Sequence, residues 1–130
     1  MTVEKVFRGI GVVAAGFIAL FFLTVVSYVV WPDVRDYVAP HPFTPENWDQ
    51  AGYLSLDPEY SRWRMRHSLT RQYELIGMSR AEVEALLGQG DADRDLYYNL
   101  GPTGHGIDFG VLELRLNEAG EVEWYEFRGH

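Results

Sequence analysis

The sequence predicts an α+β protein, with an N-terminal transmembrane helix followed by two helices packed on a three-stranded antiparallel meander. An uncharged apolar run opens the chain, two segments with helical spacing and helix caps lie in its middle, and three strand-like segments close it. The order helix, helix, strand, strand, strand favours helices that cover one face of an antiparallel sheet.

The apolar run extends from Gly9 to Trp31 and contains no charged residue. As a helix it is about 34 Å long, enough to cross a hydrocarbon core of about 30 Å. The alternative is a cleaved signal peptide, whose apolar region is usually about 7–15 residues long and ends at small residues. This run is longer and ends in Tyr28-Val-Val-Trp31. We therefore expect residues 1–32 to form an uncleaved anchor, with the span at about 9–31.

The charges beside the span predict its orientation. Lys5 and Arg8 precede it, whereas Asp33, Arg35 and Asp36 follow it. The positive-inside rule then places the N-terminus in the cytoplasm and the C-terminal domain outside. In a bacterium this corresponds to the inner membrane with a periplasmic domain.

Two further features of the span concern its surroundings. Tyr28 and Trp31 stand where interfacial aromatic anchors are expected. Gly11, Ala15 and Ala19 recur every four residues, a small-residue stripe that lets another helix approach closely. Ordinary membrane-helix composition is the alternative explanation for the stripe.

Residues 33–56 are predicted to form a proline-rich linker. Four prolines between Trp31 and Asp57 favour an extended, semi-rigid spacer: Pro32, Pro40, Pro42 and Pro45. The segment also contains aromatic residues that suggest contact with a protein surface, either of its own domain or of a neighbour: Tyr37, Phe43, Trp48 and Tyr53.

The predicted domain covers residues 57–130, and its first helix is expected to begin at Asp57-Pro58, with Asp57 as N-cap. Its predicted core face consists of four residues at helical spacing: Met65, Leu69, Tyr73 and Ile76. The same helix is basic, with Arg62, Arg64, Arg66 and Arg71. Such a run usually forms a solvated face or pairs with nearby carboxylates, and partner binding is the alternative.

The second helix has the clearest local signals. Ser79-Arg-Ala-Glu82 is a capping box, in which each side chain accepts a hydrogen bond from the other residue's backbone N–H. Val83, Leu86 and Leu87 form the apolar stripe, and Gly88 supplies the C-terminal turn.

Three strands are expected after this helix. Residues 96–100 alternate with Leu96, Tyr98 and Leu100 on one side, and residues 111–116 place alternate leucines inward. Asn117-Glu-Ala-Gly120 predicts a hairpin turn into residues 121–127. In that last strand Val122 and Trp124 are expected on one face, and Tyr125 and Phe127 on the other. Either both faces are covered, or a bulge shifts the register of the strand.

The segment from Ile76-Gly-Met-Ser79 through Glu82-Val83 and Leu86-Leu87-Gly88, with the later hairpin, resembles the SmpA/OmlA (BamE-like) family of small envelope proteins. The resemblance covers roughly residues 62–127 and lacks the lipobox cysteine of many members. It implies a non-enzymatic protein that contributes protein–protein contacts.

Composition excludes several classes of function. The part after residue 32 carries 18 acidic and 9 basic side chains, which argues against nucleic-acid binding and against docking on anionic lipid. The chain has no cysteine, and its four histidines show no close pair at metal-ligand spacing. The glycine-rich segment from Gly101 to Gly110 contains His105 and Asp108, but it lacks any phosphate-binding fingerprint and is expected to be a wide turn.

The sequence therefore predicts no catalytic residue, no metal and no cofactor, and it identifies no small-molecule ligand. The leading hypothesis is an accessory or scaffold subunit of a larger membrane or envelope complex. A tethered periplasmic binding or inhibitory module is the second, and a small enzyme using His105 and Asp108 is the third. The expected partner surface, beside the span itself, consists of Trp48, Tyr53, Arg62, Arg66 and Trp124.

Overall fold

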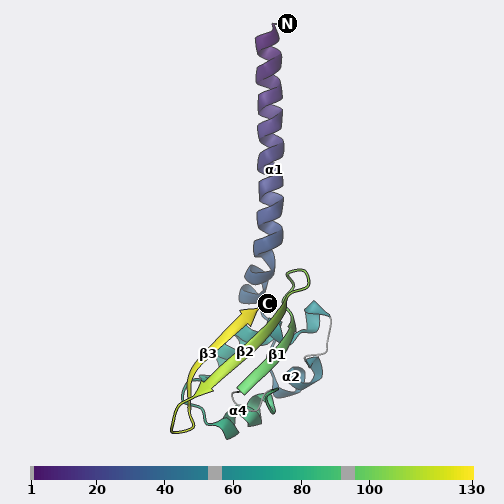
Figure 1. Ribbon diagram of the computed structural model, residues 1–130. Helices are drawn as coiled ribbons and strands as arrows, with labels where there is room; N and C mark the ends of the chain where they lie inside the picture. The colour runs from purple at the N-terminus through teal and green to yellow at the C-terminus, as the bar shows by residue number, and fades with distance from the viewer. Residues whose placement is uncertain (1, 53–56, 92–95) are drawn as a thin grey trace. The chain divides into compact units, whose positions relative to one another are not determined.

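The computed structural model describes residues 2–52, 57–91 and 96–130 and divides the chain into two compact units, Met1–Val34 and Arg35–His130 (Figure 1). Helix α1 (Val3–Val38) makes up nearly all of the first unit and contributes its last turn to the second.

Helix α1 confirms the predicted long apolar N-terminal helix. It is long and apolar enough to cross a membrane, properties that signal sequences share. Its large side chains are exposed along the whole run, as Phe17 and Phe21 illustrate at 69% and 67% exposure. Tyr28 and Trp31 are exposed as well. A helix that is apolar on every side needs an apolar environment, which a bilayer provides.

The second unit contains the predicted three-stranded antiparallel sheet. Its strands are β1 (Leu96–Pro102), β2 (Phe109–Leu116) and β3 (Val122–Gly129), in the order β1-β2-β3. Figure 1 shows the short helices behind one face of this sheet. The side chains of Leu96, Tyr98 and Leu100 are all buried on that face, as the alternation predicted.

A bulge at the start of β3 resolves the mixed pattern of that strand. Arg115 pairs with Trp124, whereas Leu116 pairs with Val122, so Glu123 is the extra residue. Val122 therefore faces the core together with Tyr125 and Phe127, and Trp124 faces away.

The helical part is more divided than the predicted pair of helices. Among the described residues of the second unit it consists of α2 (Pro45–Ala51), the 3-10 turns η1 (Pro58–Tyr60) and η2 (Arg62–Met65), α3 (Arg66–Gln72) and α4 (Arg80–Leu87). Helix α4 forms as predicted, with both hydrogen bonds of the Ser79–Glu82 capping box in place and Gly88 at its C-cap.

The single helix expected from Asp57 through Ile76 is wrong. Asp57 caps only η1, because Ser61 is extended and separates η1 from η2. Helix α3 ends at Gln72, since Tyr73 is extended. The change of direction buries Leu75 and leaves Tyr73 and Ile76 36% and 45% exposed, while Met65 and Leu69 are buried as predicted.

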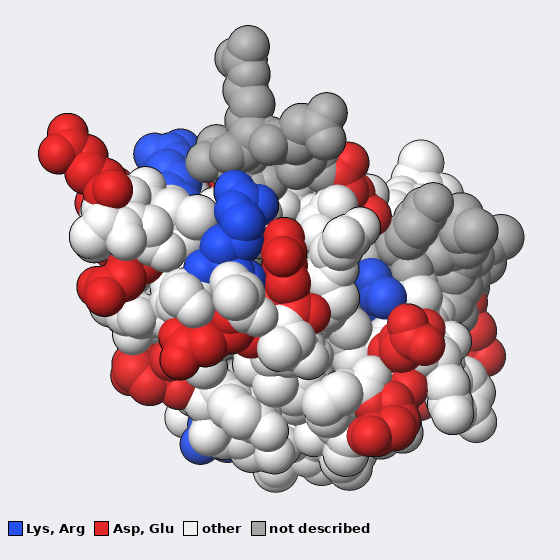
Figure 2. Space-filling view, turned by 90° about the horizontal axis from the view of Figure 1, so that it is seen from below, with Lys and Arg blue, Asp and Glu red and all other residues white. Residues whose placement is uncertain are grey.

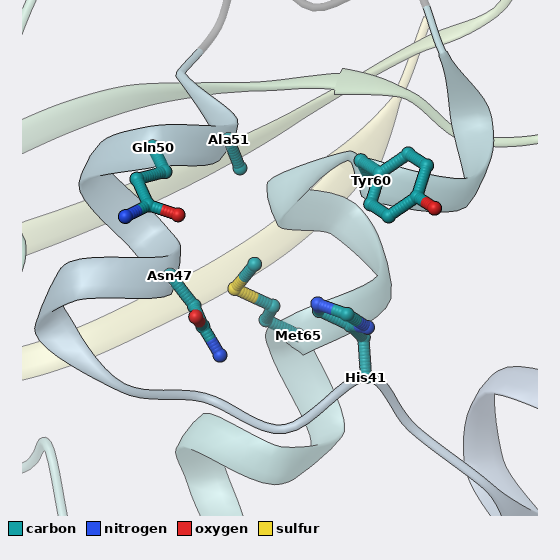
Figure 3. A pocket seen from close by; sticks show the side chains of 6 residues that line it. All are labelled: His41, Asn47, Gln50, Ala51, Tyr60 and Met65. Atoms are coloured by element: carbon teal, nitrogen blue, oxygen red, sulfur yellow. The ribbon is translucent and has the colours of Figure 1, made fainter.

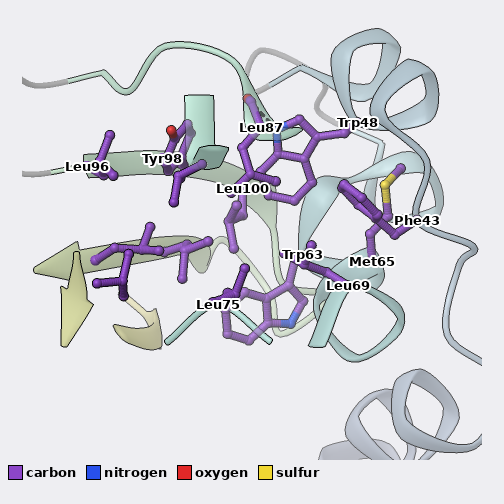
Figure 4. Close-up of a cluster of buried hydrophobic side chains, with 14 residues drawn as sticks. Phe43, Trp48, Trp63, Met65, Leu69, Leu75, Leu87, Leu96, Tyr98 and Leu100 are labelled. Atoms are coloured by element: carbon purple, nitrogen blue, oxygen red, sulfur yellow. Dashed lines mark hydrogen bonds between the residues drawn. The ribbon is translucent and has the colours of Figure 1, made fainter. Parts of the chain in front are cut away.

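The extended linker predicted over residues 33–56 does not form in its described part, residues 33–52, because the folded unit begins at Arg35 and includes α2, while residues 53–56 lie outside the described residues. Thr44 caps α2 by accepting a hydrogen bond from the Asn47 N–H, and Pro45 occupies the first helical position. Phe43 and Trp48 lie in the hydrophobic core between the helices and the sheet (Figure 4). The Trp48 indole donates to the Leu87 carbonyl at 3.0 Å. Of the four aromatics predicted to touch a protein surface, these two belong to their own domain.

Candidate functional site

A buried carboxylate fixes the last turn of α1 within the second unit. Asp36 is completely buried, and both of its oxygens accept hydrogen bonds from arginine. Arg64 Nε lies 3.0 Å from Oδ1 and Arg66 Nη1 lies 3.0 Å from Oδ2. Arg35 Nη2 lies 3.4 Å from Oδ1. A carboxylate buried in this way is costly to desolvate, and these arginines compensate its charge.

Glu59 extends this group toward solvent. Its two carboxylate oxygens lie 2.8 Å from Arg35 Nη1 and 2.7 Å from Arg64 Nη1, and its side chain is 56% exposed. Arg66 also donates to the Trp63 carbonyl at 2.9 Å and stacks over the Trp63 ring at 4.2 Å. We call Arg35, Asp36, Glu59, Arg64 and Arg66 the Asp36 cluster. It joins α1 to η1, η2 and α3.

The outer face of the sheet carries paired charges around one tryptophan. The Arg115 guanidinium lies 4.4 Å from the centre of the Trp124 ring, directly across the strands. Glu113, on the same face, pairs with Arg115 at 3.6 Å and also with Arg128. This face therefore presents an amphipathic aromatic side chain inside a set of satisfied ion pairs. Aromatic and arginine side chains of this kind are enriched at protein interfaces.

Two of the predicted partner-surface residues, Trp48 and Arg66, are only 1% and 6% exposed and are not available to a partner. Their side chains are taken up by the core and by the Asp36 cluster, respectively. Trp124 is half-buried and accessible, and Tyr53 lies outside the described residues.

The Arg62 side chain contacts Trp48 instead of pointing into solvent. Its Nε donates to the Trp48 carbonyl at 2.8 Å, and its guanidinium lies 4.9 Å from the centre of the Trp48 ring. Burial lowers the pKa of Arg62, and the nearby Asp91 and Asp49 carboxylates oppose that shift. Arg62 therefore helps to hold α2 against η2.

The small-residue stripe of the span lies on α1 at Gly11, Ala15 and Ala19. A Cβ added at Gly11 meets no atom within 4 Å, so the helix surface is open there.

Within the segment from Gly101 to Gly110, residues 103–108 form the predicted turn, and the residues on either side of it pair as the ends of β1 and β2. The Thr103 hydroxyl donates to Asp108 Oδ2 at 3.0 Å, and the Thr103 N–H donates to the Asp108 carbonyl at 3.0 Å. The Asp108 N–H donates to the His105 carbonyl at 3.2 Å. The Asp108 carboxylate, which the small-enzyme hypothesis would use, is thus engaged in a hydrogen bond within its own loop. Ile107, at the tip of the loop, is 95% exposed.

A hollow of about 420 Å³ opens between α2 and the 3-10 turns (Figure 3). Its lining mixes amide, imidazole, phenol and thioether groups: His41, Asn47, Gln50, Ala51, Tyr60 and Met65. The Asn47 amide is already committed to the Pro42 carbonyl at 3.2 Å. Within the described ranges, no group of three or more His, Cys, Asp or Glu side chains could hold a metal ion.

Tyr98 gives the domain a measurable pH dependence. Its hydroxyl donates to the Gly88 carbonyl at 2.8 Å, and burial, aided by the Glu84 carboxylate, raises the pKa of Tyr98 from 10.0 to about 12. Because the folded state holds this proton more tightly, its contribution to stability is complete below pH 10 and is lost as the pH rises toward 12.

We therefore expect the free energy of unfolding to fall between pH 10 and 12, and Tyr98→Phe to reduce that fall. The measurement is urea denaturation of both proteins at several pH values in this window. An equally steep fall in the variant would contradict the assignment. Tyr98→Phe is also expected to cost about 1 kcal/mol below pH 10, since Gly88 loses its donor.

Comparison with known proteins identifies no relative. No protein-family model matches the chain, no curated protein matches it, and no solved structure matches it. The likeness to the SmpA/OmlA family therefore stays a prediction from the sequence.

Proposed function

We propose that this chain is a non-enzymatic, single-span accessory or scaffold subunit of a larger membrane or envelope protein complex. The observation that carries the proposal is the continuity of α1. The chain passes from the apolar run into the folded second unit within one helix, Val3–Val38, and the last turn of that helix is bound into the domain through Asp36.

This continuity favours a role in which span and domain act together. A protein that uses its membrane helix only as a tether gains reach from a long flexible linker. Here the segment that could have served as a spacer is built into the domain, with Phe43 and Trp48 in its core. The alternative of a tethered module acting alone has less support for this reason.

The proposed binding surface has two parts. In the bilayer, Gly11, Ala15 and Ala19 would allow close approach of a partner helix. Outside it, the sheet face around Trp124 and Arg115 offers an aromatic side chain and a cation at one place. The acidic balance of the chain, −8 overall, would favour partners with a basic surface.

The proposed location is the inner membrane of a bacterial cell, with the N-terminus in the cytoplasm and the domain in the periplasm. Lys5 and Arg8 before the span support this orientation. Tyr28 and Trp31 are exposed on α1 and would lie at the interface where the span ends.

Affinity purification of the tagged full-length chain in mild detergent tests the proposal. We expect at least one membrane protein to be recovered in constant ratio to the chain across independent preparations. A tagged control carries the second unit after an unrelated membrane helix. Proteins that are recovered with the full-length chain but not with this control bind the span, and proteins recovered with both bind the domain. Recovery of no protein at a constant ratio would contradict the proposal.

A further inference from the structure

One end of the second unit collects exposed apolar side chains. Figure 1 shows the tip of the β1–β2 hairpin, the C-terminus and the last turn of α1 at this end, and the β2–β3 turn at the opposite end. The exposed fractions are 95% for Ile107, 42% for Phe109, 62% for Tyr37, 72% for Val38 and 62% for Tyr60. These five residues are called the apolar end.

Hydrogen bonds and packing contacts connect the parts of the apolar end. Phe109 exchanges two backbone hydrogen bonds with His130, at 3.1 and 2.9 Å, which places the C-terminus beside the base of the hairpin. A Cβ added to Gly110 would lie 2.1 Å from the Trp63 ring, so the hairpin base is packed tightly on η2. Trp63 lies under Arg66 of the Asp36 cluster, which binds the last turn of α1.

We propose that the apolar end docks on the lipid bilayer, with Ile107 inserted between the lipid headgroups. The inference rests on the proposed membrane span. Arg35 follows Trp31 by four residue steps, which reach at most about 14 Å even when fully extended. The interfacial layer on each side of a bilayer is roughly 5–8 Å thick. The end of the domain at which Arg35 lies is therefore held close to the headgroups by the length of the chain alone.

The chemistry of this end fits a bilayer interface. Tyrosine side chains are enriched there because their rings are apolar and their hydroxyls are polar. Ile107 stands on a loop closed by the Thr103–Asp108 hydrogen bonds, so insertion would not require the loop to order itself first. At the opposite end, seen in Figure 2, acidic side chains outnumber basic ones on the surface, which suits a face turned toward water.

Apolar insertion predicts little dependence on lipid charge. The domain is too acidic for attraction to anionic headgroups to drive its docking. Neutral phosphatidylcholine should therefore support docking, and salt should change it little.

Single-cysteine spin labelling of the full-length chain in phosphatidylcholine liposomes tests the inference, since the native chain has no cysteine. Labels are placed at Ile107→Cys, at Ala119→Cys on the opposite β2–β3 turn, and at Leu20→Cys in the span. We expect collisions of a water-soluble nickel chelate with the label to be roughly tenfold less frequent at 107 than at 119, because the label at 107 takes the place of the inserted side chain whereas the label at 119 stays in water.

A second pair of variants removes any contribution of the label itself to insertion. With the label at Tyr60→Cys, Ile107→Asp is expected to increase the exposure of the label to the chelate, whereas the matched change Ala119→Asp should leave that exposure unchanged.

Equal chelate access at 107 and 119, with the label at 20 deep in lipid, would overturn the docking and leave the span intact. Chelate access at 20 would instead overturn the span. Access at 107 in liposomes but not in native membrane vesicles would assign this surface to a protein partner and overturn lipid docking.

Discussion

Replacing Asp36 with alanine is expected to lower the free energy of unfolding of the second unit by about 3–5 kcal/mol. The substitution removes a buried carboxylate that lies 3.0 Å from Nη1 of Arg66, whose side chain is itself 6% exposed. It also removes one of the two carboxylates that Arg64 contacts, since Arg64 Nε lies 3.0 Å from Asp36 Oδ1. A domain of ordinary stability has roughly 5–15 kcal/mol in total, so this one change would remove a large share of it.

Urea denaturation of the full-length chain in detergent micelles, followed by tryptophan fluorescence, measures this effect. Glu59→Ala is the matched control from the same cluster. Its carboxylate contacts Arg35 and Arg64, but its side chain is 56% exposed, so the expected loss is under about 1 kcal/mol. If Asp36→Ala cost no more than Glu59→Ala, the buried carboxylate would not hold the last turn of α1 in the domain.

Replacing the span with an unrelated apolar helix of equal length is expected to reduce recovery of the membrane partner at least about tenfold, equivalent to about 1.4 kcal/mol. The physical reason is the loss of close helix approach at Gly11, Ala15 and Ala19. The replacement keeps Lys5, Arg8 and Trp31, so orientation and interfacial anchoring are preserved.

A pair of triple variants locates this effect on the helix. Gly11→Leu, Ala15→Leu and Ala19→Leu together should reproduce the loss, because three large side chains then cover the stripe. The matched set Val13→Leu, Phe17→Leu and Phe21→Leu changes a different face of the same helix, and recovery of the partner should be unchanged. Undiminished recovery with the replaced span would instead support the tethered module that acts through its domain alone.

The parts of the fold that local signals specify could be predicted from the sequence. The Ser79–Glu82 capping box and Gly88 set the two ends of α4 through hydrogen bonds within the helix itself. The alternation of Leu96, Tyr98 and Leu100 specifies which face of β1 is buried. Both kinds of signal act over a few residues, so they are readable without knowing the rest of the chain.

The parts that depend on distant contacts could not be predicted in this way. Asp36 finds Arg64 and Arg66 at separations of 28 and 30 residues, and no local pattern distinguishes it from a solvated aspartate after a span. The prolines of residues 33–56 favoured a spacer, yet Thr44-Pro45 is an N-cap followed by a proline at the first helical position. That signal was present in the sequence and could have identified α2.

The candidate site shows the same division. Internal pairing of the arginine run was one of the two ordinary explanations, and it accounts for Arg64 and Arg66. Helix α2 places Trp48 in the core. The prediction of Trp48 as a surface residue was therefore wrong for the same reason as the prediction of an extended spacer around it. The sequence pattern did not predict that Ile107 is exposed at the tip of the turn. Exposure there depends on how the two flanking strands pair, and the local sequence does not specify that pairing.

The mass of the particle purified in mild detergent tests the central claim most directly. The chain itself has a mass of 14.9 kDa. After subtraction of the bound detergent, light scattering on the size-exclusion peak should give a protein mass that exceeds one chain and includes the partner at a fixed ratio. A protein mass of 14.9 kDa, one chain alone in its micelle, would contradict the assignment of this protein as a subunit of a larger membrane complex.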